Sequence, residues 1–164
     1  MHDLEIDQDL EFQRRSWAVQ RVGWGVMALC LILALAGILG SGPLSRQDVA
    51  LPGLLRVEYQ RFTRYQTPET LTVRLEPPAT RAAEVRLWLD REHFESAKIE
   101  TITPPPVRVE SAGDRLVYVF PMSRPGEPAT ITFMMQSERL GPTAGRIGLA
   151  GVGAFAPFRQ FVYP

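Results

Sequence analysis

The chain has 164 residues, equal numbers of acidic and basic side chains, and one cysteine, Cys30. This length allows one domain besides a membrane span. The zero net charge gives no support to nucleic-acid binding, and a lone cysteine excludes an intramolecular disulfide. We expect no cofactor, because the sequence contains no cofactor-binding motif.

The first predicted element is a transmembrane helix. Residues 22–45 contain no charged side chain, and residues 26–39 are almost wholly apolar. About 20 apolar residues are enough to cross a bilayer core. We therefore predict an acidic tail over residues 1–21 and a transmembrane helix over residues 22–41. Residues 10–20 contain no Pro or Gly and are able to extend this helix inward.

The residues that flank the apolar run indicate its orientation. Basic residues are more frequent before the run than after it, and two tryptophans lie near its beginning, where indole rings favour the headgroup level. These residues are Arg14, Arg15, Arg21, Trp17 and Trp24. The pattern predicts a cytoplasmic tail and a periplasmic body, anchored in a bacterial inner membrane.

Two alternatives to a retained span stay open. The small residues Gly40-Ser41-Gly42 suit a signal-peptide cleavage site, but Pro43 would disfavour cleavage and the apolar run is long for a signal. Arg14-Arg15 also fits a twin-arginine export signal.

The helix also carries small residues at a spacing that favours close helix packing. Ala36 with Gly40, and Gly37 with Ser41, form small-xxx-small pairs. These pairs make self-association through the span possible.

The body of the chain reads as strands. After a predicted neck over residues 42–53, apolar residues alternate with polar ones, which is typical of strands with one buried face. The segments with this pattern are 55–59, 71–75, 85–89, 99–102, 107–110, 115–120, 129–136, 145–149 and 158–163. We predict a mainly β fold, an immunoglobulin-like antiparallel β-sandwich over residues 54–164, with a small barrel as the alternative.

One cluster has side chains suited to a divalent metal. Asp90, Glu92, His93 and Glu95 follow the predicted strand 85–89, and carboxylates and imidazoles are metal ligands. Arg91 lies among them, and a solvated turn explains the same residues. We therefore predict no metal site and keep the four as weak candidates.

Three further segments attract attention. Arg61 and Arg64 lie among Tyr59, Phe62 and Tyr65, a pattern that fits either lipid headgroups, a protein partner or an ordinary edge strand. The final residues 155–164 carry four aromatics, which we expect to be buried in the last strand, with an exposed recognition tail as the alternative. The glycines of residues 141–153 fit tight turns and not a phosphate-binding loop, since no Lys-Ser/Thr follows them.

Both ends of the chain carry a resemblance. Residues 12–24 read FQRRSWAVQRVGW, residues 42–45 read GPLS and residues 158–164 read FRQFVYP. In these segments the chain resembles a group of bacterial single-pass inner-membrane proteins with a periplasmic β-domain. The middle matches only in length and strand character. The resemblance implies inner-membrane placement and no activity, because no reaction is assigned to the group.

The predicted function is non-enzymatic. The body's one histidine, His93, has no second histidine or nucleophile near it in the sequence, so no catalytic set is evident. We expect a membrane-anchored interaction module, an accessory or assembly subunit that binds the bilayer and an integral-membrane or periplasmic protein. The alternative is a domain that binds a ligand or metal through residues 90–95.

Overall fold

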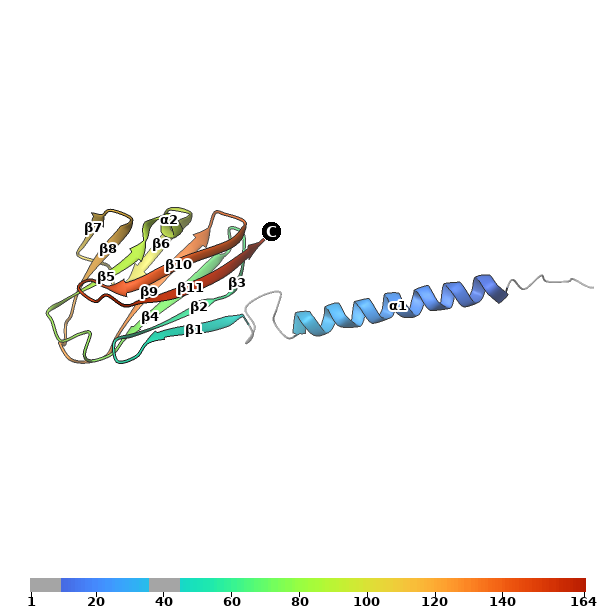
Figure 1. Ribbon diagram of the computed structural model, residues 1–164, viewed down its shortest axis with the longest axis horizontal. Helices are drawn as coiled ribbons and strands as arrows, with labels where there is room; N and C mark the ends of the chain where they lie inside the picture. Colours follow the sequence, from blue (N-terminus) through green and yellow to red (C-terminus); the bar gives the residue numbers. More distant parts are fainter. Residues whose placement is uncertain (1–9, 36–44) are drawn as a thin grey trace, which may run out of the picture.

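The computed structural model describes residues 10–35 and 45–164, with side chains from Arg15 onward. The described residues form one long helix and a two-layer β-sandwich (Figure 1). The predicted combination of one N-terminal apolar helix and a mainly β body is confirmed.

Helix α1 (Leu10–Leu35) is continuous over 26 residues. The part from Arg15 to Leu35 has a mean hydropathy of 1.8 and no buried residues, so by length and composition it is able to cross a membrane; a signal sequence near the N-terminus meets the same test. The helix begins at Leu10, so the expected extension of the helix over residues 10–20 is present. The small-residue pairs Ala36–Gly40 and Gly37–Ser41, and the outer limit of the span, lie outside the described residues.

The body forms two sheets. Sheet A has the order β1-β2-β4-β9-β6, and sheet B has the order β3-β11-β10-β5-β8-β7. The strands are β1 (Arg46–Leu51), β2 (Leu55–Gln60), β3 (Phe62–Arg64), β4 (Pro68–Leu75), β5 (Glu84–Asp90), β6 (Ala97–Thr103), β7 (Arg108–Ala112), β8 (Arg115–Pro121), β9 (Ala129–Ser137), β10 (Gly141–Leu149) and β11 (Phe155–Tyr163).

The described pairings are antiparallel except that of β3 with β11, which is parallel. Two separate sheets make the fold a sandwich and not a small barrel.

Alternating residues fill the core between the sheets. In β4, for example, Leu71, Val73 and Leu75 are buried while their neighbours face outward. Phe133 of β9 lies at the centre, in ring contact with Tyr118 and Phe120 of the opposite sheet. Strands with one apolar face thus meet across the core, as the period of two requires.

The main difference from the sequence prediction concerns the neck. Residues 46–51, predicted as part of a linker, form strand β1 and pair with β2 along their whole length. The sandwich therefore begins at Arg46 and not at residue 54. β1 has no regular buried face because it lies at the edge of sheet A, so its sequence lacks the alternation that identifies the other strands.

Candidate functional site

The candidate metal residues lie on one short turn of helix. Strand β5 ends at Asp90, and α2 (Arg91–Glu95) follows before β6. The Asp90 carboxylate does not cap α2. It accepts a hydrogen bond from Nε of Arg146 on β10, at 2.8 Å, and its side chain is only 14% exposed. The α2 turn is thus tied to the neighbouring strand by an ion pair.

Two other candidate metal ligands, Glu92 and Glu95, lie near different arginines. Glu92 lies 3.9 Å from Arg139 and its side chain is 93% exposed, while Glu95 lies 3.7 Å from Arg91. Over the part of the chain that the structure describes, no group of three or more His, Cys, Asp and Glu side chains could hold a metal ion. The structure does not bring Asp90, Glu92, His93 and Glu95 together as a ligand set.

His93 belongs to the core. Its ring contacts Phe158 edge-to-face at 4.7 Å between centroids and Phe94 at 5.1 Å. Burial lowers the pKa of the His93 imidazole to about 4, although the Asp90 carboxylate and a backbone hydrogen bond with Ala144 act in the opposite direction. The ring is therefore neutral at pH 7, and it seals the end of the sandwich beneath α2.

Gly145 of β10 makes this packing possible. A Cβ atom there would lie 2.5 Å from the Phe158 ring and 3.1 Å from the His93 ring. Three of the glycines predicted as turns, Gly141, Gly145 and Gly148, thus lie within strand β10, and at Gly145 the missing side chain admits an aromatic ring.

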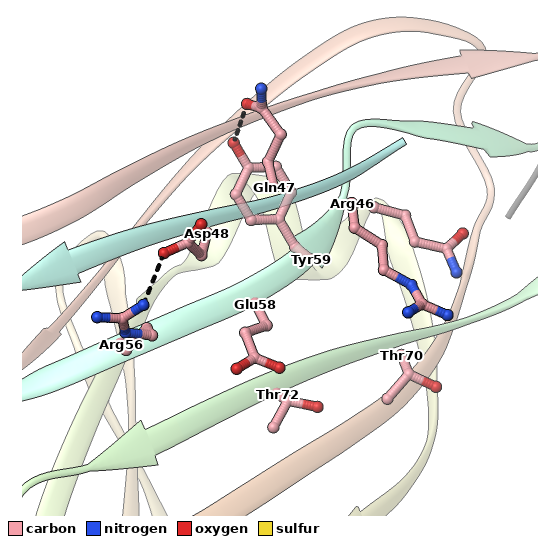
Figure 2. A pocket seen from close by; sticks show the side chains of 9 residues that line it. Arg46, Gln47, Asp48, Arg56, Glu58, Tyr59, Thr70 and Thr72 are labelled. Atoms are coloured by element: carbon pink, nitrogen blue, oxygen red, sulfur yellow. Dashed lines mark hydrogen bonds and ion pairs between the residues drawn. The ribbon is translucent and has the colours of Figure 1, made fainter. Parts of the chain in front are cut away.

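A shallow groove of about 590 Å³ lies at the free edge of sheet A (Figure 2). We call it the β1 groove. It is formed by β1, β2 and β4, and Figure 2 shows Glu58, Thr70 and Thr72 along its length. Its lining residues are Arg46, Gln47, Asp48, Arg56, Glu58, Tyr59, Gln60, Thr70 and Thr72.

The groove carries charges of both signs. Nη1 of Arg56 donates a hydrogen bond to Asp48 at 3.1 Å, and Nε of Arg74, beside the groove, donates one to Glu58 at 2.7 Å. These side chains are about half exposed, so they are accessible to a partner. The lining includes no histidine, cysteine or serine, and its chemistry is that of hydrogen bonding and ion pairing.

A buried carboxylate, Glu69, lies between the sheets at the start of β4. Ser137 Oγ and Gln160 Nε2 each donate a hydrogen bond to it at 2.9 Å. Burial raises the pKa of the Glu69 carboxyl above its ordinary value, while hydrogen bonds from Ser137, Gln160 and Thr63 lower it in part. Gln160 Nε2 also donates to the Gln60 carbonyl oxygen, so this cluster links β4, β9 and β11 to the end of β2.

The aromatic and basic residues after β2 divide between core and surface. Tyr59 is buried and its ring contacts Phe158, so it does not belong to the surface. Arg61 and Arg64 are exposed, and the Arg61 guanidinium lies 5.4 Å from the centre of the Phe62 ring. Tyr65 is partly exposed.

The last strand contradicts one prediction. The aromatics of residues 155–164 are not all buried: Phe158 is 1% exposed, but Phe155 and Phe161 are 41% and 46% exposed. The alternation of β11 turns the odd-numbered residues outward and the even-numbered ones into the core. A strand that covers a core with one face leaves the aromatics of its other face in solvent.

Comparisons with known proteins give likenesses of fold only. No family model and no curated protein matches the chain. A cohesin module from a Clostridium perfringens family 33 glycoside hydrolase is 10% identical, with a TM-score of 0.45 over 71% of this chain and 98% of that one. The PmoD soluble domain from Methylocystis is 17% identical, with a TM-score of 0.36 over 71% and 88%.

The cupredoxin domain of amoB from Nitrosocaldus yellowstonii is 15% identical, with a TM-score of 0.33 over 59% of this chain and 56% of that chain. No conclusion about function follows from likenesses this distant. The resemblance of the chain ends to a group of single-pass membrane proteins stays a prediction.

Proposed function

We propose that this protein is a non-enzymatic interaction module on a membrane anchor, an accessory or assembly subunit of an inner-membrane or envelope complex. In this proposal α1 holds the sandwich at the membrane and the β1 groove binds the protein partner. The observation that carries the proposal is the position of the groove beside an edge strand, β1, which pairs with β2 alone in the described part of sheet A.

The geometry suits an extended partner segment. An edge strand offers unpaired backbone N–H and C=O groups, and a partner strand that pairs with them receives affinity from the main chain. Alternate side chains of that segment would then meet the groove, where Asp48, Arg56 and Glu58 offer both charges. Specificity would come from these half-exposed ion pairs, whose exchange for pairs with a partner costs little.

Ligand binding at residues 90–95 receives less support. Each carboxylate of that segment lies beside an arginine, and His93 is enclosed by aromatic rings. These contacts give the segment a packing role.

The test is a pull-down of the tagged full-length chain from its own membranes in mild detergent, with mass spectrometry of the proteins that co-purify. We expect a membrane or envelope protein in a fixed ratio. The variant Asp48→Lys/Thr70→Lys, which adds positive charge to the groove, is expected to lose it. Both positions are exposed, so the fold should persist.

The matched control is Glu127→Lys/Ser123→Lys, which makes the same charge change on the exposed loop between β8 and β9. This variant is expected to keep the partner. A chain that always purifies alone would contradict the proposal, and so would a partner that is retained by the groove variant.

A further inference from the structure

Most arginines of the sandwich are neutralised, but one group is not. Residues 45–164 contain fourteen arginines, and nine of them lie within 4.0 Å of a carboxylate. The five that do not, among the described residues, are Arg46, Arg61, Arg64, Arg81 and Arg159. All except Arg81 lie at one margin of the sandwich: Arg46 on β1, Arg61 between β2 and β3, Arg64 on β3 and Arg159 on β11.

This margin surrounds the point where the chain from α1 enters the sandwich. Ser45 is fully buried, its carbonyl oxygen accepts a hydrogen bond from the Arg61 backbone N–H at 2.6 Å, and its hydroxyl donates to the Phe62 carbonyl oxygen at 3.0 Å. Phe161 N–H donates to the Arg61 carbonyl oxygen at 2.8 Å. The first residues of the body are thus fixed directly against the arginines.

The pairing of β3 with β11 completes the surface. Phe62 lies opposite Phe161, and Arg64 lies opposite Tyr163. Arg159 faces outward two residues before Phe161, which is 46% exposed. We call the surface formed by Arg46, Arg61, Phe62, Arg64, Arg159 and Phe161 the β3 margin.

The length of the connecting chain keeps this margin near the bilayer. The apolar run of the sequence ends at Leu39, and six residue steps separate Leu39 from Ser45. Fully extended, six residues span about 20 Å. A surface held this close to the bilayer meets lipid at a high effective concentration.

We propose that the β3 margin binds anionic lipid headgroups and docks the sandwich on the membrane that α1 anchors. Arginine guanidinium groups pair with phosphate through two parallel hydrogen bonds, and exposed aromatic rings favour the headgroup level. The acidic residues nearest in the sequence to the margin are already engaged: Asp48 pairs with Arg56 and Glu58 with Arg74, and Glu69 is buried. Four unpaired positive charges therefore face the bilayer with little opposing charge.

Lipid is favoured over a protein partner by the charge pattern. Arg46 belongs to both surfaces, which adjoin each other. Apart from this residue, the β1 groove pairs acids with bases, as a protein surface that binds a specific partner does, whereas the β3 margin carries one sign of charge. A surface of one sign suits a bilayer that presents phosphates without a fixed register.

The test uses the full-length chain in nanodiscs, with Cys30→Ala and a fluorophore on Thr67→Cys. Thr67 is exposed and lies in the turn between β3 and β4. Quenching by a spin label on the lipid headgroups measures the ratio of docked to undocked sandwich. We expect strong quenching in discs with about 30% phosphatidylglycerol and weak quenching in phosphatidylcholine alone. In about 1 M NaCl, where the Debye length is about 3 Å, the difference should vanish.

Substitutions then locate the binding surface. Arg61→Gln should lower the docked-to-undocked ratio about fivefold, the effect of one basic side chain at an anionic surface. The variant with glutamine at all four arginines of the margin should show the same weak quenching in both lipids. A control with Arg81, Arg86, Lys98 and Arg124 changed to glutamine removes the same charge elsewhere and should dock like the unaltered chain.

Equal thermal midpoints would show that all variants are folded. Equal quenching of the unaltered chain in the two lipids would overturn the proposal and assign the margin to a protein partner. Equal loss of docking in the control would also overturn it, because attraction would then follow net charge and not this surface.

Discussion

The α2 turn and the β3 margin are both charged segments near the end of a strand, but they differ in whether their charges are paired. At the α2 turn every charge is paired: Asp90 with Arg146, Glu92 with Arg139, and Glu95 with Arg91. At the β3 margin the arginines have no carboxylate within 4.0 Å in the described part of the chain. Charged residues that satisfy one another stabilise a fold, whereas unpaired ones remain able to bind something else.

The largest difference between the two regions should be in the loss of stability when an aromatic ring is removed. Phe158 supports the α2 turn from a fully enclosed position, so Phe158→Ala should lower the free energy of unfolding by about 3–5 kcal/mol. Phe161 lies on the same strand but faces outward at the margin. Phe161→Ala should therefore lower the free energy of unfolding by about 0.5 kcal/mol or less. Denaturant unfolding of both variants measures the contrast, and similar losses would show that the margin is part of the core.

The α2 turn should also make stability depend on pH. His93 has its pKa lowered from 6.5 to about 4, so the unfolded chain binds a proton more readily than the folded one between these values. The neutral His93 ring therefore contributes about 3 kcal/mol to the free energy of unfolding above pH 6.5, and this contribution is lost as the pH falls toward 4. Denaturant titrations across this range should show the slope in the unaltered chain.

The variant His93→Gln is the comparison for that slope. It lacks the titrating ring, so its stability should fall less steeply than that of the unaltered chain between pH 6.5 and 4. Parallel curves for the two proteins would exclude His93 as the source.

Removal of one charge should have unequal effects in the two regions. Asp90→Asn weakens a partly buried charge-assisted hydrogen bond and should cost about 1–2 kcal/mol. Arg64→Gln removes an exposed side chain that has no carboxylate within 4.0 Å among the described residues, and it should change stability by less than about 0.5 kcal/mol. If Arg64→Gln is the more harmful change in thermal unfolding, the margin has a structural role and not a binding role.

The smallest effect is expected at Glu69, which lies between the two regions. Its pKa is raised by burial, so its contribution to stability declines as the pH rises above 4.5 through the folded-state pKa. As the pH rises above 4.5, the variant Glu69→Gln should therefore become more stable relative to the unaltered chain. A relative loss at higher pH would mean that the ionised carboxylate is the form that the hydrogen bonds favour.

The sequence predicted those elements whose side chains alternate against a core. The pattern in 55–59, 71–75 and 85–89 identified β2, β4 and β5, because each segment has three alternating apolar residues on its inner face. It did not identify β1, an edge strand without such a face, or α2, whose five residues are too few to show a helical period.

The β3 margin and the α2 turn could not be predicted in full, because both depend on contacts between residues far apart in the sequence. Arg61 and Arg64 were noticeable in the sequence, but their meeting with Arg159 results from the pairing of β3 with β11, about 100 residues away. The pairing of Asp90 with Arg146 similarly joins positions 56 residues apart. This pairing engages a carboxylate that the sequence offered as a weak candidate metal ligand. Local sequence shows which charges are present, and the tertiary fold decides which of them are neutralised.

Both proposals require that the apolar helix is retained and anchors the sandwich. The most direct measurement is the intact mass of the chain recovered from carbonate-washed membranes of its own cells. We predict a full-length protein of 18.4 kDa in the membrane pellet. A shortened, soluble chain that begins near Pro43 would contradict this, because the helix would then be a cleaved signal and no tether would hold the β3 margin at the bilayer.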